Sequence, residues 1–546
     1  MNSKLIRNPV LPGFNPDPSI CRVGDDYYMA TSTFEWYPGV RVYHSKDLRN
    51  WRFASSPLDR PSMLNMLGTP DSCGIWAPCL HWHDGLFYLL YADVRRFDGN
   101  FKDTHNYLTT CASVDGTWSD PVYLNSSGFD PSLFHDDDGR KWYVNMVWDH
   151  RPDRTFFAGI VLQEFLPAEK RLAGVRKFIF KGTALDYTEG PHIYKYGGRY
   201  YLMTAEGGTG YGHAVTMARA DAVDGPYVAD PSGPVLTARD HPDCPLQRTG
   251  HADFVETQSG ELYLAHLCSR PLPGMRRSPL GREAALQKVA WTQDGWLRLA
   301  AGGCLPSVDV PAPDLPEVPV EPEIRFDHFE SPSLNPVYQW LRTPWPEEWL
   351  SLRERPGFLR LRGMESPGSL YRQALVARRQ VDHAYEAETL LEFEPENFQQ
   401  MAGLICYYNS TKFHYLYVSR DEAIGRHLGI MSCEGDVSMK VEFADWDRRT
   451  PVLDGVSLRI KVRVDHAALD FYWAYPDGEW QHVAPTLDAS VLSDEAGKGE
   501  GAHFTGAFVG LCAHDLTGMR QAADFDYFSY TALSPSQFQC EGAATD

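Results

Sequence analysis

Residues 15–32 read NPDPSICRVGDDYYMATS, and this stretch decides the fold because its layout returns four more times along the chain. Asp17 stands between two prolines, and a short apolar run follows it. A Gly-Asp turn then leads into an aromatic-rich run, which is the pattern of a β-hairpin. A single Asp-Pro pair is ordinary turn or helix-cap chemistry, so Asp17 alone indicates no function.

The repeated layout is a small turn motif, an apolar strand, a Gly/Asp turn and an aromatic strand. The other four copies are IWAPCLHWHDGLFYLLYAD (75–93), GFDPSLFHDDDGRKWYVNMVW (128–148), TEGPHIYKYGGRYYLMTAE (188–206) and TGHADFVETQSGELYLAHL (249–267). A spacing near sixty residues is too long for one hairpin and suits a four-stranded sheet with its loops. Five such sheets arranged radially predict a five-bladed β-propeller over residues 1–303.

The first strand of every propeller blade lines the central channel, so the five strand starts should meet at one place. These starts are Asp17, Ala77, Asp130, Glu189 and His251. Three of the five are acidic. Like charges brought together cost free energy, so this convergence indicates a functional site.

The rest of the chain predicts a stiff connector and a second β domain. Residues 304–323 are rich in proline and acidic residues, which favours an extended linker. From residue 324 to 546 the strands alternate apolar and polar residues, as in VSLRIKVRVD (456–465) and ADFDYFSYTAL (523–533). This pattern predicts an antiparallel β-sandwich of the jelly-roll or lectin type, so the whole protein is expected to be all-β. The tail from residue 534 is expected to be loose.

Composition limits the partners. The chain has 51 basic and 72 acidic residues and a formal net charge of −21, which disfavours nucleic acid and anionic membranes but not a neutral sugar. Its 11 cysteines are scattered without a CxxC pair, as in a reduced protein. The N-terminal residues lack the apolar run of a signal peptide, and no run is long enough to span a membrane. A soluble, cytoplasmic protein is expected.

Two carboxyl groups on either side of a bond are the minimum apparatus for glycoside hydrolysis. Glu189 has the longest of the three side chains and precedes Gly-Pro, so we assign it as the acid that protonates the leaving oxygen. Asp17 is then the base that activates water. Asp130 is left to raise the pKa of the acid and to hold it in place.

At this point the sequence resembles the β-xylosidases of glycoside hydrolase family 43. The motifs that carry the resemblance are NPVLPGFNPDPSI, TSTFEWYPGV, GIWAP, GFDPSLFHD, YTEGPHIY, MTAEGGT, GHADFVETQ and PLGREAALQK, followed in the second domain by FHYLYVSR and HFTGAFVGLCAHD. The resemblance implies a five-bladed propeller, a concanavalin-like C-terminal domain and an inverting, exo-acting mechanism on xylo-oligosaccharides. It gives Asp17, Asp130 and Glu189 the same three roles. It also implies a homo-oligomer, dimeric or tetrameric.

A binding shell is expected around the three acids. Arg282 in PLGREAAL is expected to bind sugar hydroxyls and keep Asp17 ionised, and the alternative is an ion pair with Glu283. Apolar walls for the sugar are assigned to Phe34, Trp76 and Trp148, for which core packing is the alternative. The resemblance implies that Phe504 of the second domain closes one side, which would give a short, blind pocket.

No cofactor is expected to be required. His251 is assigned to hydrogen-bond the acids or to bind a divalent cation in the channel, and a satisfied buried histidine is the alternative. The resemblance does not decide, because the family has members with and without a central metal. Asp327 and Asp526 are the ligands of a structural calcium hypothesis, for which ordinary turn or edge-strand aspartates are the alternative.

Two alternative functions stay open. One is an α-L-arabinofuranosidase, alone or as a second activity, because the two sugars present similar hydroxyl patterns. The other is a non-catalytic carbohydrate-binding propeller with a lectin-like sandwich. Converging acids argue against it, because binding alone needs no proton donor.

Overall fold

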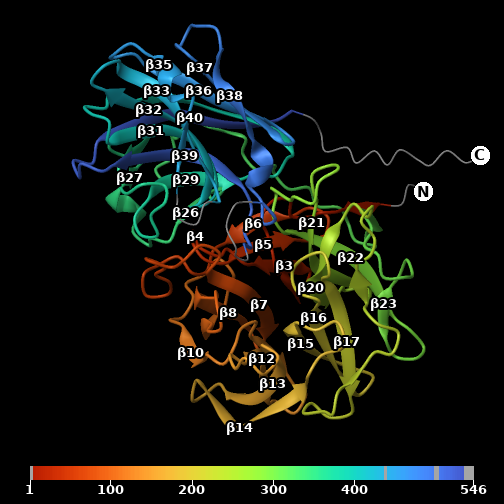
Figure 1. Cartoon of the computed structure of the whole chain (residues 1–546). Helices are drawn as coiled ribbons and strands as arrows, with labels where there is room; N and C mark the ends of the chain where they lie inside the picture. Colours follow the sequence, from red (N-terminus) through yellow and green to blue (C-terminus); the bar gives the residue numbers. More distant parts are fainter. Residues whose placement is uncertain (1–3, 436–439, 497–502, 534–546) are drawn as a thin grey trace, which may run out of the picture.

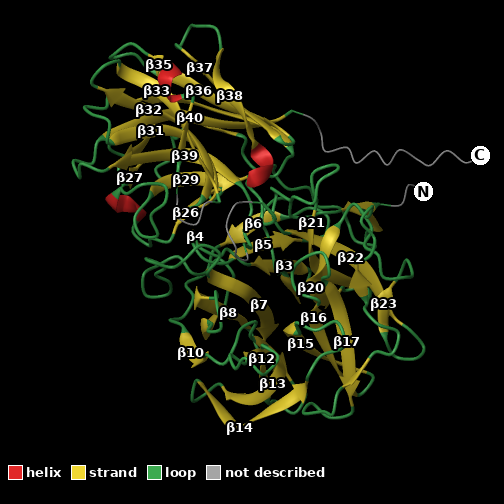
Figure 2. Cartoon of the chain, viewed as in Figure 1, coloured by secondary structure: helices red, strands yellow, loops and turns green. Residues whose placement is uncertain are grey.

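The computed structural model describes residues 4–435, 440–496 and 503–533 of the 546-residue chain. Figure 2 shows a molecule built from strands and loops. Helix in this part of the chain is limited to three 3-10 turns, η1 (Pro346–Glu348), η2 (Trp446–Arg448) and η3 (Ala489–Val491). None of the helical segments in the described ranges has the length and apolar character needed to cross a membrane. The predicted tail, from residue 534, lies outside the described residues.

Five antiparallel sheets form the propeller, the lower body of Figure 1. The strands of each blade follow one another along the chain, except that β4 (Trp36–Tyr37) leaves the first blade, and the first strand of each blade is the one nearest the centre. The blades are β2 (Ser19–Val23), β3 (Asp26–Thr31), β5 (Arg41–Ser45) and β6 (Arg52–Ser55); β7 (Gly74–His83), β8 (Leu86–Arg96), β9 (Asp103–Cys111) and β10 (Val122–Asn125); β11 (Ser132–His135), β12 (Lys141–Trp148), β13 (Phe157–Leu166) and β14 (Arg171–Phe180); β15 (Glu189–Tyr196), β16 (Arg199–Glu206), β17 (Ala214–Ala220) and β18 (Val228–Ala229), with β19 (Leu236–Thr237) on β17; and β20 (Gln247–Glu256), β21 (Leu262–Ser269), β22 (Glu283–Trp291) and β23 (Leu297–Leu299). The predicted five-bladed propeller is confirmed.

The N-terminal segment fastens the fifth blade to the start of the chain. Strand β1 (Leu5–Arg7) pairs with β24 (Asp309–Pro311), which lies within the predicted linker. The Asn8 amide then donates to the carbonyl of Leu286 on β22 and accepts from its backbone N–H, at 2.7 and 2.8 Å. These contacts close the ring because they join its first and last segments.

The second body is an antiparallel sandwich, confirming the predicted class. One sheet contains β27 (Leu350–Ser351), β28 (Leu359–Arg362), β40 (Ala522–Ala532), β30 (Ala384–Glu392), β36 (Leu458–Asp465), β37 (Ala468–Ala474) and β38 (Gln481–Asp488), with β25 (Phe326–Asp327) on β40. The other contains β34 (Glu442–Ala444), β33 (Gly425–Glu434), β32 (Lys412–Asp421), β31 (Gln400–Asn409), β39 (Phe508–Asp515), β29 (Ala374–Arg379) and β26 (Tyr338–Leu341), with β35 (Thr450–Pro451) on β33. Alternate residues of both sheets, such as Leu404, Val462 and Phe525, form its core.

The two domains share a sheet. Strand β4 (Trp36–Tyr37), from the propeller, pairs with β26 at the edge of the sandwich. Trp36 is fully buried there and stacks on Phe508 with ring centroids 3.6 Å apart. Buried ion pairs add to the interface, with Arg342 of the sandwich 2.7 Å from Asp71. The sandwich is therefore held in a fixed position on the propeller, so it can contribute side chains to a site there.

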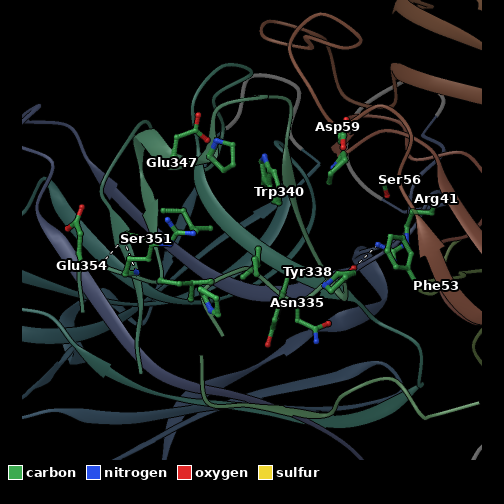
Figure 3. Close-up of a pocket in the computed structure, with 18 residues that line it drawn as sticks. Arg41, Phe53, Ser56, Asp59, Asn335, Tyr338, Trp340, Glu347, Ser351 and Glu354 are labelled. Atoms are coloured by element: carbon green, nitrogen blue, oxygen red, sulfur yellow. Dashed lines mark hydrogen bonds between the residues drawn. The ribbon is translucent and has the colours of Figure 1, made fainter. Parts of the chain in front are cut away.

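A cavity of about 590 Å³ lies along this interface (Figure 3). Arg41, Phe53 and Asp59 of the propeller face Tyr338 and Trp340 of the sandwich across it. None of the residues that the sequence predicts for chemistry lines this cavity. The converging acids lie in a second cavity, which is smaller and more apolar.

Candidate active site

Near the beginning of each inner strand lies one residue with an unusual backbone conformation, and this conformation is the same in all five blades. Asp17, Ala77, Asp130, Gly190 and His251 have φ of 55°, 40°, 55°, 57° and 44°, in the left-handed region that side chains other than glycine seldom adopt. The repeat position in the fourth blade is therefore Gly190 and not Glu189, which corrects the alignment made from the sequence. Because Glu189 precedes that position by one residue, its backbone does not place it as Asp17 and Asp130 are placed.

Asp17 is held as an ionised carboxylate. Its side chain is 5% exposed and accepts hydrogen bonds from Arg282 Nη1 at 2.9 Å and the Ser32 hydroxyl at 2.7 Å. Burial opposes the charge, but the Arg282 guanidinium and the other donors outweigh it, so the pKa of Asp17 lies below its ordinary value. The Glu283 alternative for Arg282 is wrong, because Glu283 is paired with Arg270 at 2.6 Å.

Asp130 connects the third blade to the fourth. Its Oδ2 accepts a hydrogen bond of 2.9 Å from the backbone N–H of Gly190, next to Glu189. Burial and the charge of Asp17 raise the pKa of Asp130 to about 8. A side chain at Gly190 would be strained, since φ there is 57° and a Cβ would lie 3.1 Å from the His251 ring. Asp130 thus fixes the backbone that carries Glu189.

Glu189 is held in its protonated form. Burial raises its pKa well above the ordinary value, and the charges of Asp130 and Asp17 raise it further. Arg282 and Lys102 act in the opposite direction but do not offset these effects. A carboxyl group that stays protonated beside one that stays ionised is the arrangement that acid–base catalysis requires.

All nine residues predicted for catalysis or substrate binding line one cavity of about 230 Å³. They are Asp17, Asp130, Glu189, Phe34, Trp76, Trp148, His251, Arg282 and Phe504. Phe34 and Trp76 are buried, with ring centroids 5.6 Å apart, and form one continuous apolar wall. Trp148 is half-buried and its indole N–H donates to the carbonyl of Asn100 at 2.8 Å, which fixes the ring at the cavity edge.

Phe504 comes from the sandwich and closes the apolar wall. Its ring lies 5.7 Å from that of Trp76 and 6.3 Å from that of Phe34, measured between centroids. Its carbonyl accepts a hydrogen bond of 2.9 Å from Arg282 Nη2, and its N–H donates to the Ser72 hydroxyl at 3.1 Å. The loop approaches so closely that a Cβ on Gly281 would lie 2.5 Å from the carbonyl oxygen of Thr505. Arg282 therefore contacts both the base and the closing loop.

Several cavity residues were missed by the sequence analysis. Phe129 and Tyr187 line the cavity and lie within two residues of Asp130 and Glu189 in sequence, so the repeat itself could have indicated them. Lys102 and His213 also line it, but they lie outside every repeated motif. Burial lowers the pKa of Lys102 to about 8, and its ammonium group lies 4.2 Å from the centroid of the Trp148 ring.

The other predicted residues have simpler environments. His251 is buried in the cavity wall, where burial lowers its pKa. Asp327 Oδ1 accepts a hydrogen bond of 2.9 Å from the backbone N–H of Phe329, as in an ordinary turn. Within the described ranges, the one group of three or more His, Cys, Asp or Glu side chains close enough to hold a metal ion includes neither Asp327 nor Asp526. Calcium at those aspartates and a cation at His251 both stay predictions.

Comparisons with known proteins agree with this geometry. Residues 6–297 match the family described as "Glycosyl hydrolases family 43", and residues 326–531 match "Beta xylosidase C-terminal Concanavalin A-like domain". The chain is 52% identical to "Xylosidase/arabinosidase 43B" of Humicola insolens, over 96% of this chain and 97% of that protein. It is 48% identical to "Beta-xylosidase" of Bacillus subtilis (strain 168), over 96% and 99%. A crystal structure of xylan beta-1,4-xylosidase from Bacillus halodurans C-125 superposes with a TM-score of 0.94 at 54% identity, covering 96% of this chain and all of that one.

Proposed function

The chain belongs to glycosyl hydrolase family 43, and from this premise we propose that it is an inverting, exo-acting β-1,4-xylosidase that releases xylose from the non-reducing ends of xylo-oligosaccharides. The observation that carries the proposal is the meeting of Asp17, Asp130 and Glu189 on one small, aromatic-walled cavity. Its volume of about 230 Å³ is below the range of about 300–1,000 Å³ typical of drug-sized ligands, so it suits a single sugar unit.

The two carboxyl groups that we assign to the reaction lie on this cavity. Asp17 takes a proton from a water molecule as the water oxygen attacks the anomeric carbon. Glu189 gives its proton to the glycosidic oxygen as the bond from that oxygen to the anomeric carbon breaks. Attack opposite to the leaving group inverts the configuration, so a β-linked substrate yields α-xylose. Such enzymes separate the two carboxyl groups by about 6.5–9.5 Å to leave room for the water.

Proton NMR of the first-formed sugar tests this directly. We expect xylobiose to release α-xylose, which then mutarotates to the equilibrium mixture. A first product in the β configuration would contradict inversion, and tight binding of xylobiose without turnover would favour a non-catalytic sugar-binding propeller.

An α-L-arabinofuranosidase activity is the second candidate. It is favoured by the 52% identity to a protein named as both xylosidase and arabinosidase. Comparing kcat/KM on 4-nitrophenyl β-D-xyloside and 4-nitrophenyl α-L-arabinofuranoside shows which of the two activities is greater. We expect the xyloside to be the better substrate.

Phe504→Ala should weaken substrate binding and transition-state stabilisation without unfolding the propeller. Loss of a half-buried aromatic ring costs about 1–2 kcal/mol of binding free energy. The value of kcat/KM on the aryl xyloside should therefore fall about 5–30-fold. The matched control is Phe398→Ala, which removes an exposed ring of the same domain and should leave kcat/KM unchanged. Equal kinetics for both variants would show that Phe504 does not contact the sugar.

We also assign the protein to the cytoplasm and to xylan degradation, as a dimer or tetramer. The ten cysteines in the described ranges are all free thiols, as expected in a reducing compartment. The assembly state follows from family resemblance, and light scattering of the purified chain measures it.

A further inference from the structure

A second ring of residues lies beneath the candidate active site. Two positions beyond the left-handed residue, the five inner strands carry Ser19, Cys79, Ser132, His192 and Asp253. Most polar groups in this ring have partners inside the propeller. The Ser19 hydroxyl donates to Asp253 at 2.8 Å, and the Ser132 hydroxyl donates to the carbonyl of Pro191.

Three side chains of this region come together across the axis. Cys79 and His81 are two residues apart and therefore on the same face of β7, in the second blade. His192 comes from β15, in the fourth blade. One ligand atom of each, a thiol sulfur and two imidazole nitrogens, lies within 4.8 Å of the other two.

His192 supplies a second, independent observation that points to a ligand. Its side chain is 95% buried, being 5% exposed, and its Nδ1 has no hydrogen-bond partner among the residues that the structure describes. A buried, unpaired ring nitrogen costs free energy unless something binds it. His192 belongs to the same cluster as Cys79.

We propose that Cys79, His81 and His192 form a Zn²⁺ site inside the propeller, separate from the catalytic carboxylates. One thiolate and two imidazoles are a donor set that zinc prefers over calcium or magnesium. Tetrahedral Zn–S and Zn–N bonds of about 2.3 and 2.0–2.1 Å place donor atoms about 3.3–3.6 Å apart. A water molecule completes the fourth position.

The donor atoms of the cluster suit a bound metal ion. His81 and His192 each offer an imidazole nitrogen, and Cys79 offers its sulfur. The nearby Asp253 carboxyl group accepts three hydrogen bonds, from Ser19, Ile20 and Tyr194. Binding of zinc releases the Cys79 thiol proton to solvent, so the thiolate brings one negative charge to the metal.

The structural consequence is a link between blades that are not neighbours. The contact between β7 and β15 is made by side chains reaching across the channel, whereas adjacent blades pack strand against strand. A metal bound to both would tie the second blade to the fourth and stabilise the closed ring.

The test uses the full chain without an affinity tag, stripped of metal by a chelator and dialysed against Zn²⁺ or Co²⁺. We expect one zinc per chain by elemental analysis and an increase in the unfolding temperature. X-ray absorption should show one sulfur and two imidazole nitrogens at the metal, and the Co²⁺ form should show a thiolate charge-transfer band. No zinc retained after dialysis, or zinc with only oxygen and nitrogen neighbours, would overturn the proposal.

Variants locate the site. Cys79→Ser and His81→Gln should each lose the zinc and the zinc-dependent rise in unfolding temperature, while Cys244→Ser, at a half-buried thiol outside the cluster, should keep both. Full zinc content in Cys79→Ser would contradict the assignment. If Cys79→Ser does not fold, the absorption spectrum of the wild-type protein and the His81→Gln variant still decide. Xylosidase activity is not the readout, so failure of this proposal leaves the proposed function intact.

Discussion

Glu189→Ala will slow the hydrolysis of xylobiose by about 10²–10⁴-fold, the range that a positioned general acid contributes. The loss will be much smaller for an aryl xyloside with a strongly acidic phenol, because such a leaving group departs without a proton. The physical reason is the burial of Glu189 beside two other carboxyl groups, which keeps its proton in place. Measuring kcat/KM over a series of aryl xylosides checks this. The kcat/KM of the variant should depend far more steeply on the pKa of the leaving phenol than that of the wild type.

The pH dependence of the wild type follows from the same groups. Asp17 must be ionised for activity, and its pKa is lowered. On the acid side, kcat/KM should therefore fall as the pH drops through that lowered pKa. Glu189 must be protonated, and its pKa is raised, so kcat/KM should also fall as the pH rises through that raised pKa. Because Asp130, with a pKa of about 8, interacts with Glu189, the alkaline limb reports the pair. Glu189→Ala should lose that limb on activated substrates.

Glu206→Gln is the matched control for Glu189. Glu206 is also a buried glutamate of the fourth blade, on the strand that pairs with β15, but its oxygens accept hydrogen bonds from Thr183 and Thr188. We expect it to lower stability while keeping the wild-type dependence on the phenol pKa. If Glu189→Ala lost the same factor on every leaving group, Glu189 would not be the proton donor.

Asp17→Ala will reduce turnover on all substrates by about 10²–10⁴-fold, whatever the leaving group, because activation of water is needed in every case. The variant also removes the buried charge that Arg282 pairs with, at 2.9 Å. A small anion such as azide should therefore enter the vacated space and attack the anomeric carbon. We expect azide to restore turnover of an activated aryl β-xyloside and to give α-xylosyl azide.

Asp136→Asn is the control for Asp17. Asp136 is a buried aspartate of the third blade that pairs with Lys195 at 2.9 Å and does not line the catalytic cavity. We expect near wild-type turnover and no effect of azide. A β-configured azide product from Asp17→Ala would mean that attack occurs from the face of the leaving group, which contradicts the assignment of Asp17 as the base of an inverting enzyme.

The sequence predicts the site residues that belong to the repeated motif. Asp17 and Asp130 occupy the same position in two blades, so aligning the repeats was enough to bring them together. Glu189 was aligned one residue out of register. Either the glutamate or the glycine of TEGP could occupy the repeat position, and only the positive φ of Gly190 identifies the glycine. Lys102 and His213 belong to no repeated motif, so no pattern marked them.

By itself, the sequence determined the five blades, the sandwich and the three acids that meet. Hairpin turns, strand alternation and a near-sixty-residue period are local properties, and radial symmetry converts them into a common centre. Only the tertiary structure decided that Arg282 pairs with Asp17 rather than with Glu283, and that Cys79, His81 and His192 meet across the axis. These contacts join residues distant in the chain, and their partners are chosen by packing and charge in three dimensions, which no local pattern encodes.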